Sequence, residues 1–271
     1  MYNIFEMRKK YLKFPKIFFF LIFLNKESFY PGETVSVRIK EIPAGTETKC
    51  IFQEKEYPLF FTEENTGRVL IGLPGDLKAG EYKFSMQTGG EKEERTIKIE
   101  EKIFPEERVT FSPEKIKLLT LPENEKQREL ILSTLRVCSE KQNWQGKFSL
   151  PATGKISSPY GVRRSTENFH KGIDISTPSY TSVFAPNGGS ILLATQLNLQ
   201  GNTVIIDHGQ SVMTVYYHLS SLAVKPGQLV KKGDKIGEVG DSGLATAPHL
   251  HWGLYIHSEA VDPLVWLNEE F

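Results

Sequence analysis

Four of the six histidines in this chain lie in three short segments of its C-terminal half. The first segment contains His170 and Asp174, the second contains His218, and the third contains His249 and His251. Imidazole nitrogens and carboxylate oxygens are ligands that zinc takes in catalytic sites, where three protein ligands leave one position open for water. These residue types therefore predict a metal site that could activate water.

The spacing of these residues allows them to meet. Residues two apart in a strand share a face, so His249 and His251 would present two imidazoles together. His170 and Asp174 are four apart, and either a strand or a helical turn would bring both to one side. These two residues and one histidine of the pair supply three ligands for a metal that lowers the pKa of its water to about 7. His218 and the remaining histidine are then free for proton transfer and for stabilising an oxyanion.

The sequence that flanks these residues contains specific motifs. The three segments read HKGID, YYHLSSL and APHLHWGL in chain order, with SPYGVRR, GNTVIIDHG and GDSGLATAPHLH beside them. Over roughly residues 147–266 the chain resembles the lysostaphin/LytM-type peptidoglycan endopeptidases, which are zinc metallopeptidases of family 23. The family often has Gly-Thr-Pro-Val shortly after the aspartate, whereas this chain has Ser-Tyr-Thr-Ser-Val at 179–183. That departure affects a local turn and leaves the metal site intact.

The resemblance implies a role for each of the five residues. It makes His170, Asp174 and His251 the ligands of one Zn²⁺ ion. His218 and His249 match two further family histidines that assist catalysis, with His249 as the expected general base and His218 as the group that polarises or stabilises the oxyanion. The implied activity is hydrolysis of peptide bonds in the stem peptides or cross-links of cell-wall peptidoglycan.

Two other functions compete with this interpretation. Some proteins of the same fold have lost metal ligands, and they bind peptidoglycan or activate other hydrolases without catalysis; the presence of all five residues argues against this alternative. The stretch VKPGQLVKKGDKIGEVG resembles the hairpins of biotinyl and lipoyl carrier domains. No Met-Lys-Met or Asp-Lys-Ala sequence for cofactor attachment is present there, so the likeness indicates a shared fold alone.

The remaining polar and aromatic residues near the motifs have simpler interpretations. His208 is predicted to lie in a turn, and His257 is predicted to be solvated near the end of a strand. Arg163 and Arg164 either contact carboxylates of the substrate or form a solvated rim. Trp252, beside His251, is predicted to belong to the groove wall or the core.

The elements that position these residues are predicted to be mainly β. Glycine and β-branched residues dominate 147–271, which is expected to form an antiparallel β barrel-sandwich hybrid peptidase domain. Residues 25–102 show short alternating segments between proline and glycine turns, as in an immunoglobulin-like β-sandwich accessory domain. Residues 103–146 are predicted to be a linker with a helix over 123–142. If the accessory domain covers the groove, the full-length chain would be latent.

The first 24 residues differ from the rest. Five basic residues precede an apolar run, IFFFLIFL at 17–24, which is the layout of a secretory signal. The run is shorter than the roughly 20 residues that span a bilayer, and no small-x-small cleavage site follows. Residues 1–24 are therefore interpreted as a signal peptide or membrane tether, with a buried first strand or helix as the alternative. The predicted location is exported, in the periplasm or cell envelope.

Composition limits the partners of the chain. Its 271 residues fit two domains, and 33 Lys plus Arg balance 33 Asp plus Glu. Without a basic surplus, nucleic acid is excluded as the main partner, and membrane contact is expected only through an uncleaved N-terminal segment. The sequence predicts no oligomeric state. Cys50 and Cys138 allow either one disulfide outside the cytoplasm or two free thiols.

Overall fold

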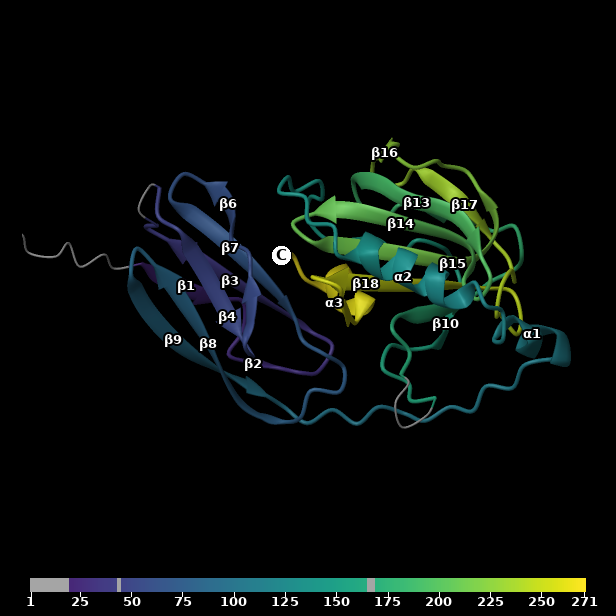
Figure 1. Cartoon of the computed structure of the whole chain (residues 1–271), viewed down its shortest axis with the longest axis horizontal. Helices are drawn as coiled ribbons and strands as arrows, with labels where there is room; N and C mark the ends of the chain where they lie inside the picture. The colour runs from purple at the N-terminus through teal and green to yellow at the C-terminus, as the bar shows by residue number, and fades with distance from the viewer. Residues whose placement is uncertain (1–19, 43–44, 165–168) are drawn as a thin grey trace, which may run out of the picture.

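The computed structural model describes residues 20–42, 45–164 and 169–271 (Figure 1). These residues form three antiparallel-rich sheets and three short helices, so the prediction of a mainly β fold is confirmed. Among the described residues, no helix has the length and apolar character needed to span a membrane. Most of the predicted leader lies outside the described residues.

Two sheets face each other in the N-terminal part of the chain. The four-stranded sheet has the order β1 (Leu21–Leu24), β3 (Thr34–Lys40), β7 (Thr66–Gly72) and β6 (Phe60–Glu63). The five-stranded sheet has the order β2 (Ser28–Phe29), β9 (Glu91–Ile99), β8 (Gly80–Thr88), β4 (Thr48–Phe52) and β5 (Lys55–Tyr57). Strand β3 shows why the sheets pack, because Val35, Val37 and Ile39 are fully buried while the residues between them face outward. We call this part the N-terminal sandwich.

The end of the predicted leader is part of this sandwich. Leu21–Leu24 form strand β1, which pairs with β3 from Leu21↔Lys40 to Leu24↔Val37. Phe20 is buried in the sandwich core. The predicted leader, residues 1–24, therefore includes a paired strand at its end, and residues 20–24 fit the alternative of a buried first strand. Cys50 is buried in the same core and Cys138 is exposed, and both thiols are free.

The linker is extended first and helical later. After β9 the chain runs along the outer edge of the molecule to helix α1 (Pro113–Leu118), and helix α2 (Asn124–Leu135) follows (Figure 1). Helix α2 begins close to the predicted position but ends earlier than residue 142. It buries Ile131 and Leu135, whereas Leu130 and Cys138 stay exposed. The predicted helix was too long because the chain after Leu135 instead leads Trp144 into the core.

The C-terminal domain is built on one antiparallel sheet of ten strands. Its main path is β10 (Lys155–Ser158), β11 (Ile173–Ser176), β18 (His249–Ile256), β15 (Val212–Leu222), β14 (Gly201–Gly209), β13 (Gly189–Leu197) and β16 (Leu229–Val230). Off this path, β12 (Ser182–Phe184) pairs with β17 (Lys235–Val239), β17 pairs with β15, and β19 (Glu259–Val261) pairs with β18. Helix α3 (Pro263–Asn268) follows β19 and buries Trp266. Strand β18 lies between β11 and β15, so it is well placed to carry a site.

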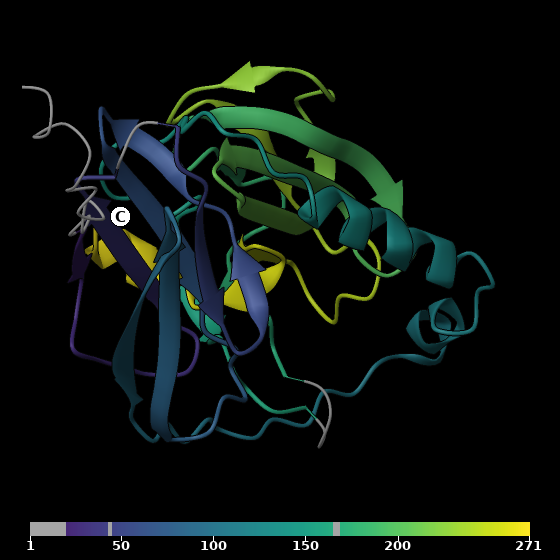
Figure 2. The ribbon, with the colours of Figure 1, turned by 60° about the vertical axis from the view of Figure 1, so that its left-hand side comes forward.

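The sandwich and the C-terminal domain pack directly on each other, as both views show (Figures 1 and 2). Gly72 of β7 lies so close to the C-terminal domain that a Cβ there would be 3.0 Å from Val261 Cγ1. The indole nitrogen of Trp266 donates to Thr34 Oγ1 at 3.1 Å. Leu70 of β7 belongs to the core cluster of the C-terminal domain. Each part therefore keeps its own core cluster, and Leu70, Gly72 and the Trp266–Thr34 hydrogen bond join the two parts.

Candidate metal centre

Three neighbouring strands bring the predicted residues together. The register pairs Asp174 of β11 with His251 of β18, and His251 in turn with Tyr217 of β15. His249 shares the face of His251, while Leu250 between them is fully buried in the core. The strand interpretation of the His-x-His segment is therefore what the structure shows.

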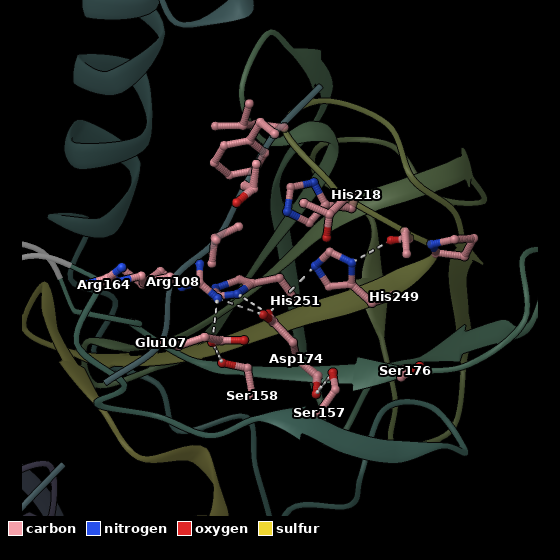
Figure 3. Close-up of a pocket in the computed structure, with 17 residues that line it drawn as sticks. Glu107, Arg108, Ser157, Ser158, Arg164, Asp174, Ser176, His218, His249 and His251 are labelled. Atoms are coloured by element: carbon pink, nitrogen blue, oxygen red, sulfur yellow. Dashed lines mark hydrogen bonds and ion pairs between the residues drawn. The ribbon is translucent and has the colours of Figure 1, made fainter. Parts of the chain in front are cut away.

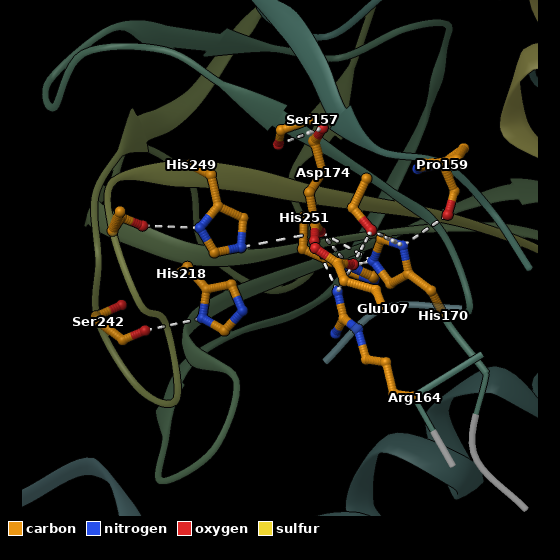
Figure 4. A network of polar contacts seen from close by, with 12 residues as sticks. Glu107, Ser157, Pro159, Arg164, His170, Asp174, His218, Ser242, His249 and His251 are labelled. Atoms are coloured by element: carbon orange, nitrogen blue, oxygen red, sulfur yellow. Dashed lines mark hydrogen bonds and ion pairs between the residues drawn. The ribbon is translucent and has the colours of Figure 1, made fainter. Parts of the chain in front are cut away.

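His170, Asp174 and His251 converge on one point. Nε2 of His170, Oδ1 of Asp174 and Nδ1 of His251 lie 2.9 Å from one another, so they form an equilateral triangle (Figure 4). All three residues are buried, with 3%, 7% and 8% of their surfaces exposed. They form a group of nitrogen and oxygen atoms able to hold a metal ion.

The hydrogen bonds around the triangle test whether a metal fits. His170 Nδ1 lies 2.9 Å from the carbonyl oxygen of Pro159, which can only accept, so Nδ1 carries the proton. Nε2 of the neutral ring then presents a lone pair to the oxygen of Asp174 and the nitrogen of His251. Electron pairs packed this closely in a buried place favour a cation between them, because buried charges need a partner. The donor set therefore fits a metal of the zinc type.

The electrostatics of the triangle point the same way. Burial raises the pKa of Asp174, but the hydrogen bonds and positive charges that His170 and His251 supply when protonated outweigh burial and hold this pKa well below its usual range. Burial lowers the pKa of His251. An ionised carboxylate and a neutral imidazole are the protonation states that metal binding requires.

His218 and His249 form a second pair beside the triangle. Their rings lie 4.8 Å apart, and Nε2 of His249 is 3.8 Å from Asp174 Oδ1. His218 Nδ1 donates to the Ser242 carbonyl and His249 Nδ1 donates to the Ala247 carbonyl, both at 2.8 Å. In the neutral rings, Nε2 of each residue is therefore free to accept a proton. Burial, with the nearby charges of His249 and His251, lowers the pKa of His218 to about 3.

His218 is held by an unusual backbone. Its φ of 64° lies in the left-handed region, and its amide donates to the Gln200 carbonyl at 2.8 Å. This conformation is uncommon outside glycine and costs of order 1–3 kcal/mol. Ser242 supports the contact between His218 and Gln200, because its hydroxyl accepts from the Asn202 amide and donates to the Leu219 carbonyl. The strain and the network together fix where His218 points.

Two further residues complete the surroundings of the triangle. Tyr217 stacks on His251, with ring centroids 5.1 Å apart and planes 7° from parallel. Arg164 Nη2 lies 3.1 Å from Asp174 Oδ2, the oxygen that faces away from the triangle. Tyr217 was missed as a site residue, although its place beside His218 in the motif was a signal. For Arg164, the structure shows a contact that neither sequence interpretation included.

A cavity of about 390 Å³ opens at the cluster (Figure 3). The C-terminal domain lines it with Asp174, His218, His249, His251 and small polar side chains such as Ser176 and Thr246. The linker lines it with 107–111, and Glu107 and Arg108 lie beside the triangle. This crossing could not be predicted from the sequence, because the contact joins segments far apart along the chain.

The other two histidines are structural. The predicted turn at His208 and the predicted solvation of His257 were wrong, although His257 does follow the end of β18. His208 is fully buried within β14, where Nδ1 meets the Gly188 carbonyl and Nε2 meets Thr214. His257 packs against Tyr57 and Phe60 of the sandwich instead of lying in solvent. Both errors have one cause, since tertiary packing covers segments that look exposed in sequence. Trp252 is fully buried, so of its two predicted places it takes the core.

The geometry therefore suits a domain that holds a metal ion and uses it to activate water, as metallopeptidases do. The sequence profile of Peptidase family M23 matches residues 168–263, which contain all five residues. The C-terminal domain belongs to this family.

Named relatives match a part of this chain. The peptidoglycan DD-endopeptidase ShyA of Vibrio cholerae is 38% identical over 123 residues, which are 44% of this chain and 29% of that protein. The DD-carboxypeptidase/endopeptidase Mpg of Neisseria meningitidis is 39% identical over 114 residues, 41% of this chain and 26% of that protein. The chain thus matches less than a third of the length of these two curated relatives.

One solved structure resembles nearly the whole chain. A candidate M23 peptidase from Pseudomonas aeruginosa is 27% identical with a TM-score of 0.68, and the match covers 90% of this chain and 96% of that one. The similarity therefore extends beyond the M23 region into the N-terminal half of the chain.

Proposed function

We propose that this protein is a zinc-dependent endopeptidase that hydrolyses peptide bonds in peptidoglycan stem peptides or cross-links. The observation that carries the proposal is the triangle of His170 Nε2, Asp174 Oδ1 and His251 Nδ1, which lie 2.9 Å from one another. The names of ShyA and Mpg support the substrate class.

Each residue of the cluster has a proposed role. His170, Asp174 and His251 would hold the ion, and zinc bound there supplies Lewis acidity toward water and the scissile carbonyl. His249 Nε2 lies 3.8 Å from Asp174 Oδ1, and its Nδ1 meets the Ala247 carbonyl, which leaves Nε2 as the nitrogen that faces the triangle, so His249 is the proposed general base. His218 keeps its proton on Nδ1, so Nε2 can stabilise an oxyanion only after it takes up a proton. We therefore propose that His218 takes part in proton transfer as well.

The proposed substrate bears on the location, and the site residues bear on the alternative function. We propose that the protein is exported and acts in the periplasm or cell envelope, where peptidoglycan lies. A catalytically silent binding or activating factor would not need all five histidine and aspartate side chains intact in one cluster, so this alternative is not favoured.

Single alanine variants at the five positions test the assignment. Variants of His170, Asp174 and His251 are expected to lose both metal and hydrolysis. Variants of His218 and His249 are expected to keep the metal while the rate falls about 10²- to 10⁴-fold, as for loss of an acid/base group. Metal content is measured after dialysis, and hydrolysis is followed by mass analysis of fragments from purified peptidoglycan. Equal loss of metal in all five variants would refute the division of roles.

A further inference from the structure

The two oxygens of Asp174 have different partners. Oδ1 faces the nitrogens of His170 and His251 at 2.9 Å, while Oδ2 accepts a hydrogen bond from Arg164 Nη2 at 3.1 Å (Figure 4). The side chain of Asp174 is 10% exposed, and that of Arg164 is 30% exposed. The carboxylate is thus held from both sides in a place with little water.

Arg164 is suited to fixing this carboxylate. A guanidinium stays charged at all working pH values and donates in a rigid, planar geometry. Held at Oδ2, the carboxylate cannot turn to offer both oxygens to an ion, and Oδ1 stays at the corner of the triangle. Hydrogen-bond partners behind metal ligands commonly fix ligand orientation in this way, and their loss typically costs 10- to 100-fold in metal affinity or activity.

We propose that Arg164 is a positioning residue that orients Asp174 toward the metal, which rests on the proposed function above. The alternative, in which Arg164 binds a carboxylate of the substrate, is opposed by its surroundings. Its Nη2 is engaged with Asp174 and also lies 4.0 Å from Glu107 Oε2, so two carboxylates of the chain already face it.

Substitution of Arg164 separates these interpretations. R164Q is expected to weaken zinc affinity about 10- to 100-fold, measured by competition with a chromophoric chelator, and to change the visible spectrum of the cobalt-loaded protein. R164K keeps the charge without the planar fork and is expected to restore part of the affinity. R163Q is the matched control, because within the described residues the neighbouring Arg163 side chain makes no hydrogen bond or ion pair, and this variant is expected to keep wild-type affinity.

Each outcome has one meaning. Unchanged zinc affinity in R164Q with a raised KM would overturn the inference in favour of substrate binding, and no change in either would overturn it in favour of a solvated rim. A wild-type protein that takes up no zinc would contradict the proposed function itself. Failure of the two ideas is thus distinguishable.

A second observation concerns the linker segment 105–112, which we call the strap. At one rim of the site, two backbone hydrogen bonds hold the strap. The Glu107 amide donates to the Arg163 carbonyl at 3.0 Å, and the Arg163 amide donates to the Pro105 carbonyl at 2.8 Å. At the other rim, Lys115 Nζ donates to the carbonyls of Asp241 and Gly243 at 2.8 and 2.6 Å. The strap is therefore tied on both sides of the cluster.

Between these ties the strap lies over the site. Val109 and Phe111 line both the cavity of about 390 Å³ and an adjoining cavity of about 640 Å³, and both cavities reach His218 and His251. Within the described part of the chain, residues 108–111 make no hydrogen bond, and residues 20–99 contribute nothing to either cavity. The cover on the site is thus the strap and not the N-terminal sandwich.

We infer that the strap competes with the peptide substrate for this groove. A peptide that reaches the triangle must cross the same space, so only molecules with the strap displaced would bind it. The apparent affinity for substrate is then reduced by the fraction of open molecules. A segment with no internal hydrogen bonds and two small anchors is the kind of element that opens at low cost.

Weakening one anchor tests this inference in the full-length chain. K115A removes the donor to Asp241 and Gly243, and KM for soluble peptidoglycan fragments is expected to fall severalfold with kcat unchanged. K117A, an exposed lysine on the same helix, is the control and is expected to keep the wild-type KM. An unchanged KM in K115A would overturn the inference, and a raised KM would show that the strap builds the substrate site. Absence of hydrolysis by every protein, wild type included, would instead contradict the proposed function.

Discussion

Gly172 lies between the first and second ligands in sequence and against the third in space. A Cβ at this position would be 2.5 Å from the Trp252 carbonyl oxygen and 2.9 Å from Cε1 and Nε2 of His251. An ordinary contact begins at 3.4 Å, so the backbone of β18 would have to retreat by about 0.9 Å and the His251 ring by about 0.5 Å. Catalytic groups tolerate displacements of only about 0.5 Å. Gly172→Ala therefore perturbs a metal-holding ring without removing any functional group.

The expected result is a loss of function larger than the loss of stability. Misplacement of about 1 Å can cost about 10²-fold in rate, so kcat/KM on peptidoglycan fragments should fall by that order and zinc affinity should weaken. Overpacking should lower the free energy of unfolding by about 1–3 kcal/mol. The assays are fragment release followed by chromatography, chelator competition and urea unfolding.

A glycine in the sandwich provides the control. A Cβ at Gly67 would lie 2.5 Å from Leu59 Cδ2, a clash of equal size with the end of a flexible, half-buried side chain. Gly67→Ala should lower stability by a comparable or smaller amount and leave zinc affinity unchanged. Wild-type zinc affinity and rate in Gly172→Ala would refute the reasoning that this glycine keeps His251 in place.

Three other predictions concern the domain contact and the metal. Burial and the charge of Lys55 lower the pKa of His257 from 6.5 to about 4, so the unfolded chain binds more protons between these values. His257 therefore contributes up to about 3 kcal/mol to the free energy of unfolding, and this contribution is fully present above pH 6.5 and lost as pH falls toward 4. In H257F the free energy of unfolding, measured with urea, should depend less on pH in this range. An unchanged pH dependence would contradict this prediction. Arg68 stacks on Trp144 and donates to Gln142 and Gln210. Arg68→Met should cost about 2–4 kcal/mol in urea unfolding because both amides lose a buried partner, and a loss below 0.5 kcal/mol would contradict this. Zinc at 100 times its Kd should stabilise the chain by about 2.7 kcal/mol in thermal melts, chelator should remove this gain, and identical melts would count against a resident ion.

The sequence predicted the local parts of the site better than its long-range parts. The alternation around Leu250 was enough to place His249 and His251 on one face, since strand periodicity is a local property. The packing of His257 on Tyr57 could not be predicted, because it depends on how the sandwich docks. The strap across the site is equally non-local.

The end of the helix and the strand at residues 21–24 were hard to predict for related reasons, while most of the predicted leader lies outside the described residues. Helical spacing continued past Leu135, but burial of Trp144 redirected the chain there. The run at 17–24 is apolar, as in a signal peptide, but β-branched and aromatic residues also favour a strand. Residues Leu21–Leu24 pair with the edge of β3. Apolar composition alone does not distinguish a signal segment from a β-strand.

The junction near Gly72 has a practical consequence for anyone who trims this protein. A fragment that starts at residue 147 would leave bare the surface where Ile256 and Val261 meet β7, and Trp266 would lose its acceptor Thr34. Such a fragment would expose apolar surface and tend to self-associate. A low turnover measured on it would reflect the loss of the N-terminal sandwich and not a defect in the catalytic residues.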